Sequence, residues 1–520
     1  MSHAHPHDPP QSDAAGAPTG RHWVRWGFIY GGILVFLMLI QLPRLADWAF
    51  FSFYDPGTAL KGDLLISHGM RPAIDFGYTH GLATLIFAHI GFALLGRTAW
   101  AFLAMTAFLE LLMGLAIARF AMQMNIRGGP RTFLICALPV AIMPCYLTLT
   151  HPLEALLLLW AIAEQAGGHR RRALAICTAC LFVKPSMAYV LGFFLVVLTL
   201  RTVGIRKGAV RRLWRECWPA MAVMAGMSLL CAGVFGLHSL LLTIVPITGM
   251  KTYHDTHFGF LLGSGVHFWS PVGHSAAYYL ITPAGIWLFC AGVTIVLTLG
   301  YFSPPVRRVR SSLHAPQRET AVCIGLMLLA FLLGFYGWVK SWEYYAYLPV
   351  LFTAVWLTAI KVKRRWLTAI CVFAVLSQST HAVLSVWSWS GKLHNRQTGG
   401  LWIYPIQYQD WQAVQKATGG KRTLVLSNGF LLWMPPHWHM PQSWFPEPGI
   451  PTPLEFKRIN NEILAARRVV TWNAYGRKDV WNNPAVAQAK SRFKKVWTGN
   501  YFTVWARGKK SFVSTVYPRQ

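Results

Sequence analysis

Apolar runs long enough to cross a lipid bilayer recur along most of this sequence. A helix that spans the bilayer core needs about 20 consecutive, mostly apolar residues. We predict eleven membrane-spanning helices, at residues 24–44, 100–122, 132–149, 151–166, 173–184, 185–200, 217–237, 279–301, 319–338, 343–360 and 366–388. The composition agrees, because 54% of the 520 residues are hydrophobic, which is too apolar for a soluble protein of this size. The predicted fold class is therefore a polytopic α-helical membrane protein.

The two runs at 173–184 and 185–200 are each shorter than a full span. Pro185 separates them, and proline ends or kinks a helix because it lacks a backbone donor and clashes with the preceding turn. We expect either a tilted helix broken at Pro185 or a re-entrant hairpin buried in protein.

The regions outside the apolar runs differ in character. Residues 1–20 are polar and rich in proline, glycine and alanine, which predicts a disordered tail ahead of a transmembrane domain at 21–390. Residues 391–520 alternate short β-rich runs with amphipathic stretches, and predict a small α/β domain. Within this domain we expect helices at 408–420 and 453–466, strands at 422–427 and 467–472, and a hairpin at 494–507 that turns at Gly499.

Arginine and lysine mark alternate loops, in clusters at 127–131, 170–172, 201–215, 307–318 and 361–365. The positive-inside rule makes these loops cytoplasmic, and Arg21 and Arg25 place the N-terminus on the same side. An odd number of spans then puts the C-terminal domain in the periplasm of a bacterial inner membrane. The loops at 45–98 and 238–278 also lie outside, the first of them with an interfacial apolar helix at 80–96.

The net charge of +30 arises from 48 basic residues against 18 acidic ones. The basic residues are divided between short loops and one terminal domain, which argues against nucleic acid and favours anionic lipids or a phosphorylated lipid substrate as partners. Because acids are scarce, those of the outer loops stand out: Asp47, Asp55, Asp63, Asp75, Asp255 and Glu343, with Glu154 at the outer end of its helix.

The stretch YDPGTALKGDLLISHGMRPAIDFGYTHGLATLIFAHIGFALLG, residues 54–96, is the most informative part of the chain. It resembles the GT-C superfamily of polytopic glycosyltransferases, in particular the relatives of dolichyl-phosphate-mannose and aminoarabinose transferases. The residues that carry the resemblance are Asp55, Gly69, Pro72, Asp75, Phe76, Tyr78 and Gly81. The sequence Lys184-Pro185-Ser186 and the outer C-terminal domain are similar to the same family. Asp55 departs from its pattern in being followed by Pro56.

The resemblance implies a transferase that takes a sugar from a polyprenyl-phosphate-linked donor and attaches it to a lipid or polysaccharide acceptor outside the cytoplasm. No W-W-D-Y-G motif occurs, and Trp342-Glu343-Tyr344-Tyr345 is the nearest equivalent. A divalent metal is therefore possible but unsupported, no cofactor is assigned, and no metal ligands are assigned.

Such a transfer needs a carboxylate to accept the acceptor's proton and cations to offset the charge on the departing phosphate. Asp55 follows the first span directly and is the expected base, with Asp75 as a second catalytic candidate that contacts the sugar or orders the loop. The expected phosphate ligands are Arg71, Lys184 and Lys340. Four more residues are expected to contact the acceptor or the sugar: Tyr78, His80, Glu154 and Glu343.

Structural roles compete with these assignments. An aspartate before Pro-Gly often caps a helix or forms a turn, Lys184 can extend from a short helix to the interface, and Glu154 can cap its own helix. Two other functions stay open, an envelope polysaccharide polymerase or ligase of another fold and a lipid transporter or flippase. The first is expected to depend on the 238–278 loop, and the second on mid-membrane charges, of which Glu110 is the clear acidic example.

Overall fold

A computed structural model of the protein describes residues 21–45, 56–76, 78, 80–142, 149–204, 208–245, 289–290, 292–294, 296, 313–334, 345, 347–360, 362–376, 393–394, 402–403, 405–426, 438–439, 453–472, 481 and 484–508. The N-terminal tail, most of the 238–278 loop and most of the predicted span at 279–301 lie outside these residues. So do Asp55, Lys340 and Glu343.

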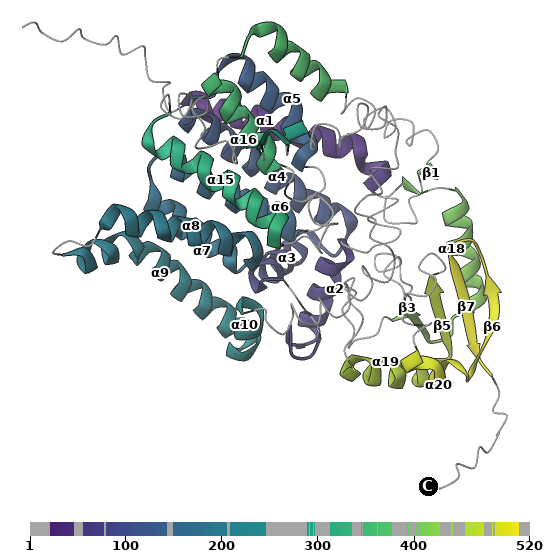
Figure 1. Ribbon diagram of the computed structural model, residues 1–520. Coiled ribbons are helices and arrows are strands. Elements are labelled where there is room, and N and C mark those ends of the chain that lie inside the picture. Colours follow the sequence, from purple (N-terminus) through teal and green to yellow (C-terminus); the bar gives the residue numbers. More distant parts are fainter. Residues whose placement is uncertain are drawn as a thin grey trace, which may run out of the picture.

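The described residues up to 376 are mostly helical, as the apolar runs predict (Figure 1). The helices are α1 (Arg21–Leu45), α2 (Pro56–Ser67), α3 (Leu82–Leu95), α4 (Ala99–Gln123), α5 (Gly128–Ile142), α6 (Thr150–Ala166), α7 (Arg170–Leu181), α8 (Pro185–Val203), α9 (Ala209–Phe235), α10 (Leu237–Ile244), α15 (Ala315–Gly334) and α16 (Tyr347–Ile360), followed by helical residues 364–376.

Two of the described helices are long and apolar enough to cross a membrane on their own, at Trp100–Gln123 and Ala209–Phe235. Shorter apolar helices occupy Trp23–Leu39, Leu82–Leu95, Met187–Val203 and Tyr347–Ile360. The count of eleven spans stays a prediction. The break at Pro185 is confirmed, because α7 ends at Leu181 and Pro185 is the first residue of α8.

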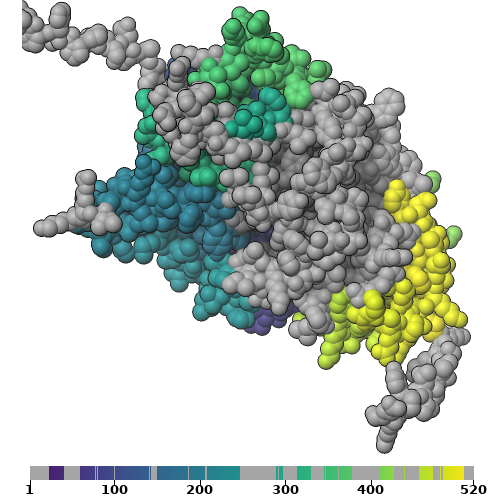
Figure 2. Space-filling model, viewed as in Figure 1, coloured from purple at the N-terminus to yellow at the C-terminus, as the bar shows by residue number. Residues whose placement is uncertain are grey.

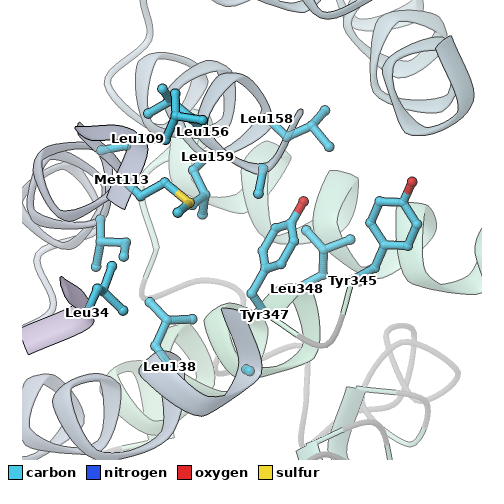
Figure 3. Close-up of a cluster of buried hydrophobic side chains, with 14 of the residues drawn as sticks. Leu34, Leu109, Met113, Leu138, Leu156, Leu158, Leu159, Tyr345, Tyr347 and Leu348 are labelled. Carbon is cyan, nitrogen blue, oxygen red and sulfur yellow. The ribbon is translucent and has the colours of Figure 1, made fainter. Parts of the chain in front are cut away.

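Small residues allow α1 and α4 to pack closely. A Cβ atom added to Gly114 of α4 would lie 2.2 Å from the backbone nitrogen of Gly31 and 2.4 Å from the carbonyl oxygen of Gly27, both on α1. Glycines four residues apart give such a helix a flat strip on which a second backbone can lie. Beside this contact, buried side chains of α1, α4, α6 and α16 form one apolar cluster, which includes Leu34 and Leu348 (Figure 3).

Ion pairs tie several helix ends together at one end of the bundle. Arg119, near the end of α4, lies 3.2 Å from a carboxylate oxygen of Glu164, near the end of α6. Arg170, the first residue of α7, lies 2.8 Å from Glu319, near the start of α15. Arg119 and Arg170 thus mark one end of the bundle, which we call the arginine end. The opposite end holds the start of α6 and the junction of α7 with α8.

The C-terminal region forms the small α/β unit expected from its pattern. Its sheet has the strand order β4-β3-β5-β7-β6, parallel between β3 and its two neighbours and antiparallel from β5 to β6. The elements are β1 (Leu393–His394), β2 (Trp402–Ile403), α18 (Pro405–Thr418), β3 (Thr423–Leu426), β4 (Trp438–His439), α19 (Pro453–Ala465), β5 (Arg468–Trp472), a 3-10 turn (Pro484–Val486), α20 (Ala487–Lys490), β6 (Phe493–Thr498) and β7 (Phe502–Arg507). The hairpin turns at Gly499, as predicted.

Two figures show how this unit lies on the molecule. The sheet stands at one side of the helical bundle, and α19 lies on the side of the sheet that is nearer to α2 (Figure 1). The hairpin of β6 and β7 forms part of the outer surface (Figure 2). A separate apolar core that includes Leu424, Ile459 and Val469 holds the sheet to α19.

Candidate active site

The loop between α2 and α3 carries most of the motif of residues 54–96, and we call residues 71–81 the site loop. Its end is fixed by backbone hydrogen bonds: the N–H of Gly81 donates to the carbonyl of Val183 at 2.8 Å, and that of Ala83 to the carbonyl of Phe182, also at 2.8 Å. A Cβ atom on Gly81 would lie 2.1 Å from the oxygen of Phe182. Glycine is required here by this close approach, which brings the site loop against the junction of α7 and α8.

Lys184 is the last residue before α8, and its backbone is extended, with φ −156° and ψ 112°. This conformation is the one that a following proline favours. The Lys184 Nζ atom lies 3.2 Å from Nδ1 of His151 and 3.5 Å from Oε2 of Glu154. Both partners stand in the first turns of α6, three residues apart and so on one face of the helix. The side chain of Lys184 is 16% exposed and that of Glu154 only 2%.

Tyr345, in the segment that precedes α16, contacts both Glu154 and Lys184. Its hydroxyl group donates to Glu154 and lies 2.9 Å from Oε1 and 3.1 Å from Oε2. Its ring centre lies 5.3 Å from the Lys184 ammonium, within the range of a cation–π contact. The tyrosine stands at the margin of the large apolar cluster, beside Tyr347 (Figure 3).

The site loop adds two rings to this group. Tyr78 is buried, and its ring meets that of His80 edge to face at a centroid distance of 5.8 Å. The His80 ring in turn lies 6.3 Å from that of His151. We call these six residues, Tyr78, His80, His151, Glu154, Lys184 and Tyr345, the site cluster.

The site cluster combines one carboxylate, one ammonium, two imidazoles and two phenols at the end of the bundle opposite to the arginine end. A buried carboxylate is stable only when it is paired and hydrogen-bonded, and Glu154 has both kinds of partner. Lys184 and the histidines supply donors of the kind that bind phosphate oxygens. In the described part of the chain, no three histidine, cysteine or acidic side chains are grouped so that they would hold a metal ion.

Arg71 and Asp75 pair with each other at the start of the site loop. The Asp75 carboxylate accepts hydrogen bonds from the backbone N–H of Arg71 at 2.8 Å and from its Nε at 3.2 Å. Although partial burial opposes ionisation, these bonds hold the pKa of Asp75 below its usual value. Of the two roles expected for Asp75, its contacts favour ordering of the loop. The Arg71 side chain remains 57% exposed.

Four of the nine residues predicted for the site come together in the site cluster: Tyr78, His80, Glu154 and Lys184. Asp55, Lys340 and Glu343 lie outside the described residues, and Asp55 immediately precedes α2. The prediction missed His151 and Tyr345. His151 had a signal, since it stands three residues before Glu154 on a helix. For Tyr345 the only signal was weak: it belongs to a short run of acidic and aromatic residues.

The prediction also counted Asp63 among the outer acids without giving it a role. Its side chain is only 1% exposed. One carboxylate oxygen lies 2.7 Å from Nδ1 of His89, and the other lies 2.6 Å from Nε of Arg97. These contacts join α2 to α3 and the residues that follow it, so the role of Asp63 is structural.

No model of a protein family matches the chain, and no curated protein matches it in sequence. The chain is similar in structure to two GT-C superfamily glycosyltransferases. One is arabinofuranosyltransferase AftD from Mycobacteria, at 12% identity and a TM-score of 0.43, over 94% of this chain. The other is ArnT from Cupriavidus metallidurans, in a structure with undecaprenyl phosphate, at 14% identity and a TM-score of 0.44, over 94% of this chain and 98% of ArnT.

The chain spans 40% of the length of AftD. At these identities and TM-scores the two likenesses transfer neither a substrate nor a catalytic residue to this protein.

Proposed function

We propose that this protein is a membrane glycosyltransferase that moves a sugar from a polyprenyl-phosphate donor to a lipid or polysaccharide acceptor on the outer face of a bacterial inner membrane. The observation that carries the proposal is the position of Lys184, which is largely buried between Glu154 and His151 and adjoins a loop with the GT-C-like motif. A lysine held in this way is a ready ligand for a phosphate group.

The transfer breaks the bond between the sugar C1 and a phosphate oxygen, and the phosphate leaves with the electron pair. The positive charge of Lys184 stabilises this leaving group, and hydrogen bonds from His80 and His151 add to the effect. Glu154 accepts from Tyr345 through both of its oxygens and pairs with Lys184, so its role is to hold the lysine in position.

The acceptor hydroxyl attacks C1 and gives its proton to a carboxylate. Asp55 is the proposed base, because it directly precedes α2, which leads into the site loop, and because the family motif places an aspartate there. Asp75 supports the same loop through Arg71. Lys340 and Glu343 precede Tyr345 in the chain, and they are proposed to contact the donor phosphate and the sugar respectively.

The proposed orientation in the membrane follows from the two ends of the bundle. The arginine end faces the cytoplasm and contacts anionic lipids, in line with the positive-inside rule. The site cluster then lies at the outer end, at the depth where the phosphate of a polyprenyl lipid is found, and the C-terminal domain lies in the periplasm.

Binding of a polyprenyl phosphate to the purified protein in lipid nanodiscs tests the phosphate site. Loss of one hydrogen bond to a charged group costs about 1.5–3 kcal/mol, which corresponds to an affinity about 10 to 150 times weaker. Lys184→Ala is expected to lose this much. Lys494→Ala is the control, because Lys494 is an exposed lysine of β6 that belongs neither to the site cluster nor to the arginine end. Equal affinities of wild type and Lys184→Ala would refute the phosphate site.

A further inference from the structure

The site loop makes contact with the C-terminal domain through one strong hydrogen bond. Nη1 of Arg458, on α19, donates to the backbone carbonyl of Asp75 at 2.9 Å. The two residues are 383 positions apart in the chain. A guanidinium group that binds a carbonyl oxygen forms a charge-assisted bond, which is stronger than a neutral one.

The start of the site loop is a compact turn that presents this carbonyl. The N–H of Asp75 donates to the carbonyl of Arg71 at 2.8 Å, while the Asp75 carboxylate accepts from the N–H of Arg71. Its side chain and its N–H are thus used within the turn. The carbonyl is the group that remains for an outside partner, and Arg458 takes it.

A second, electrostatic interaction lies one helical turn further along α19. Glu462 stands four residues after Arg458 and therefore on the same face of the helix. It interacts electrostatically with Lys61 of α2, whose side chain is buried. The face of α19 that carries Arg458 and Glu462 is thus set against both α2 and the loop that follows α2.

The other end of the site loop is held by the junction of α7 and α8, through Gly81 and Val183. Tyr78 and His80 lie between this anchor and the turn at Asp75. A loop fixed at both ends loses far less entropy when its side chains take up one arrangement than a loop fixed at one end.

From these contacts we infer that Arg458 is a positioning residue: its bond to Asp75 keeps Tyr78 and His80 beside His151, so that the C-terminal domain completes the site. The effect on sugar transfer rests on the proposed function. The effect on the conformation of the site loop is independent of the proposed function.

Hydrogen exchange of the full-length protein in nanodiscs tests the inference. Arg458→Ala is expected to increase the exchange of a peptide that covers residues 71–84, and Arg458→Lys to restore much of the protection because it keeps a charged donor. Lys457→Ala is the control, since Lys457 is exposed and adjacent on the same helix. Arg458→Gln replaces the alanine variant if that variant fails to fold.

Transfer kinetics form the second readout. We expect Arg458→Ala to lower kcat about 10-fold, equivalent to about 1.4 kcal/mol, with little change in KM for the donor. Unchanged exchange in the 71–84 peptide would overturn the inference. Increased exchange in a protein without any transferase activity would instead refute the proposed function and leave the role of Arg458 in the loop intact.

Discussion

Lys184 and Glu154 illustrate how single residues create a charged site in an apolar surrounding. Their side chains are 16% and 2% exposed, and a buried ion pair of this kind is useful only if further hydrogen bonds satisfy it. Tyr345 supplies such bonds to both oxygens of Glu154. The phenol therefore orients the carboxylate, and the carboxylate orients the lysine.

Tyr345→Phe tests whether Tyr345 orients Glu154 and, through it, Lys184. The change removes the hydroxyl and leaves a buried carboxylate short of a donor, which costs about 1–3 kcal/mol. We expect a lower unfolding temperature in detergent and a transfer rate reduced about 5 to 150 times. Tyr189→Phe is the control, because the Tyr189 hydroxyl bonds the carbonyl of Ile244 from an exposed position. Full activity of Tyr345→Phe would show that Glu154 does not need this donor.

Several residues of the site were predictable one by one, but their contacts were not. The motif around Asp75 pointed to Tyr78 and His80, and the Lys-Pro-Ser sequence pointed to Lys184. The pairing of Lys184 with His151 depends on the packing of α6 against α7, because 33 residues separate the two in the chain. A sequence pattern of helical period shows which face is buried, and it does not show which helix covers that face.

Among the elements, the junction of α7 with α8 has the largest effect on the site. Pro185 predicted the break correctly, since a proline suits the first position of a helix and restricts the residue before it. The short gap that results exposes the carbonyls of Phe182 and Val183, which accept from the backbone at the start of α3. The requirement for glycine at position 81 comes from this tertiary contact.

Gly81→Ala is expected to separate α3 from this junction. The added methyl group would lie 2.1 Å from a backbone oxygen, and backbone on both sides has to move. Overpacking of this kind costs about 1–3 kcal/mol. We predict a lower unfolding temperature and loss of most transfer activity. Gly32→Ala is the matched control, because no atom lies within 4 Å of a Cβ at that helical position. Equal stability of the two variants would contradict the close approach.

For the whole molecule, the sequence predicted a helical part followed by a C-terminal α/β unit. Within that unit it predicted α18, α19, β3, β5 and the hairpin of β6 and β7, but not β1, β2, β4 or α20. That the basic clusters all lie on the cytoplasmic side stays a prediction, which rests on their alternation along the chain. The docking of α19 on α2 could not be predicted from the sequence. The residues around Arg458 and Lys61 form no local sequence pattern that would indicate a partner nearly 400 residues away.

The docking of the C-terminal domain is expected to depend on pH through Lys61. Burial lowers the pKa of Lys61 from 10.5 to about 7, although Glu462 opposes the shift. Between these two pH values the separated state binds more protons than the docked state, so docking strengthens as pH rises above about 7. His439 interacts electrostatically with both Lys61 and Arg422, and burial lowers the pKa of His439 as well.

Unfolding temperatures at pH 7.5 and pH 9 measure this dependence. The wild type is expected to become more stable relative to Lys61→Met as pH rises, because the variant lacks the proton that docking must displace. His439 lies below this window and contributes little to it. A constant difference between the two proteins across the window would show that Lys61 is not titrated by docking.

Mass spectrometry of envelope glycolipids tests sugar transfer at the site cluster, in cells that carry the wild-type protein, Asp55→Asn or Lys184→Ala at equal levels in the membrane. We expect a glycolipid mass that is present with the wild type and absent or strongly reduced with both variants, and the missing mass identifies the sugar. An unchanged glycolipid profile with both variants would contradict the claim that this protein transfers a sugar at this site.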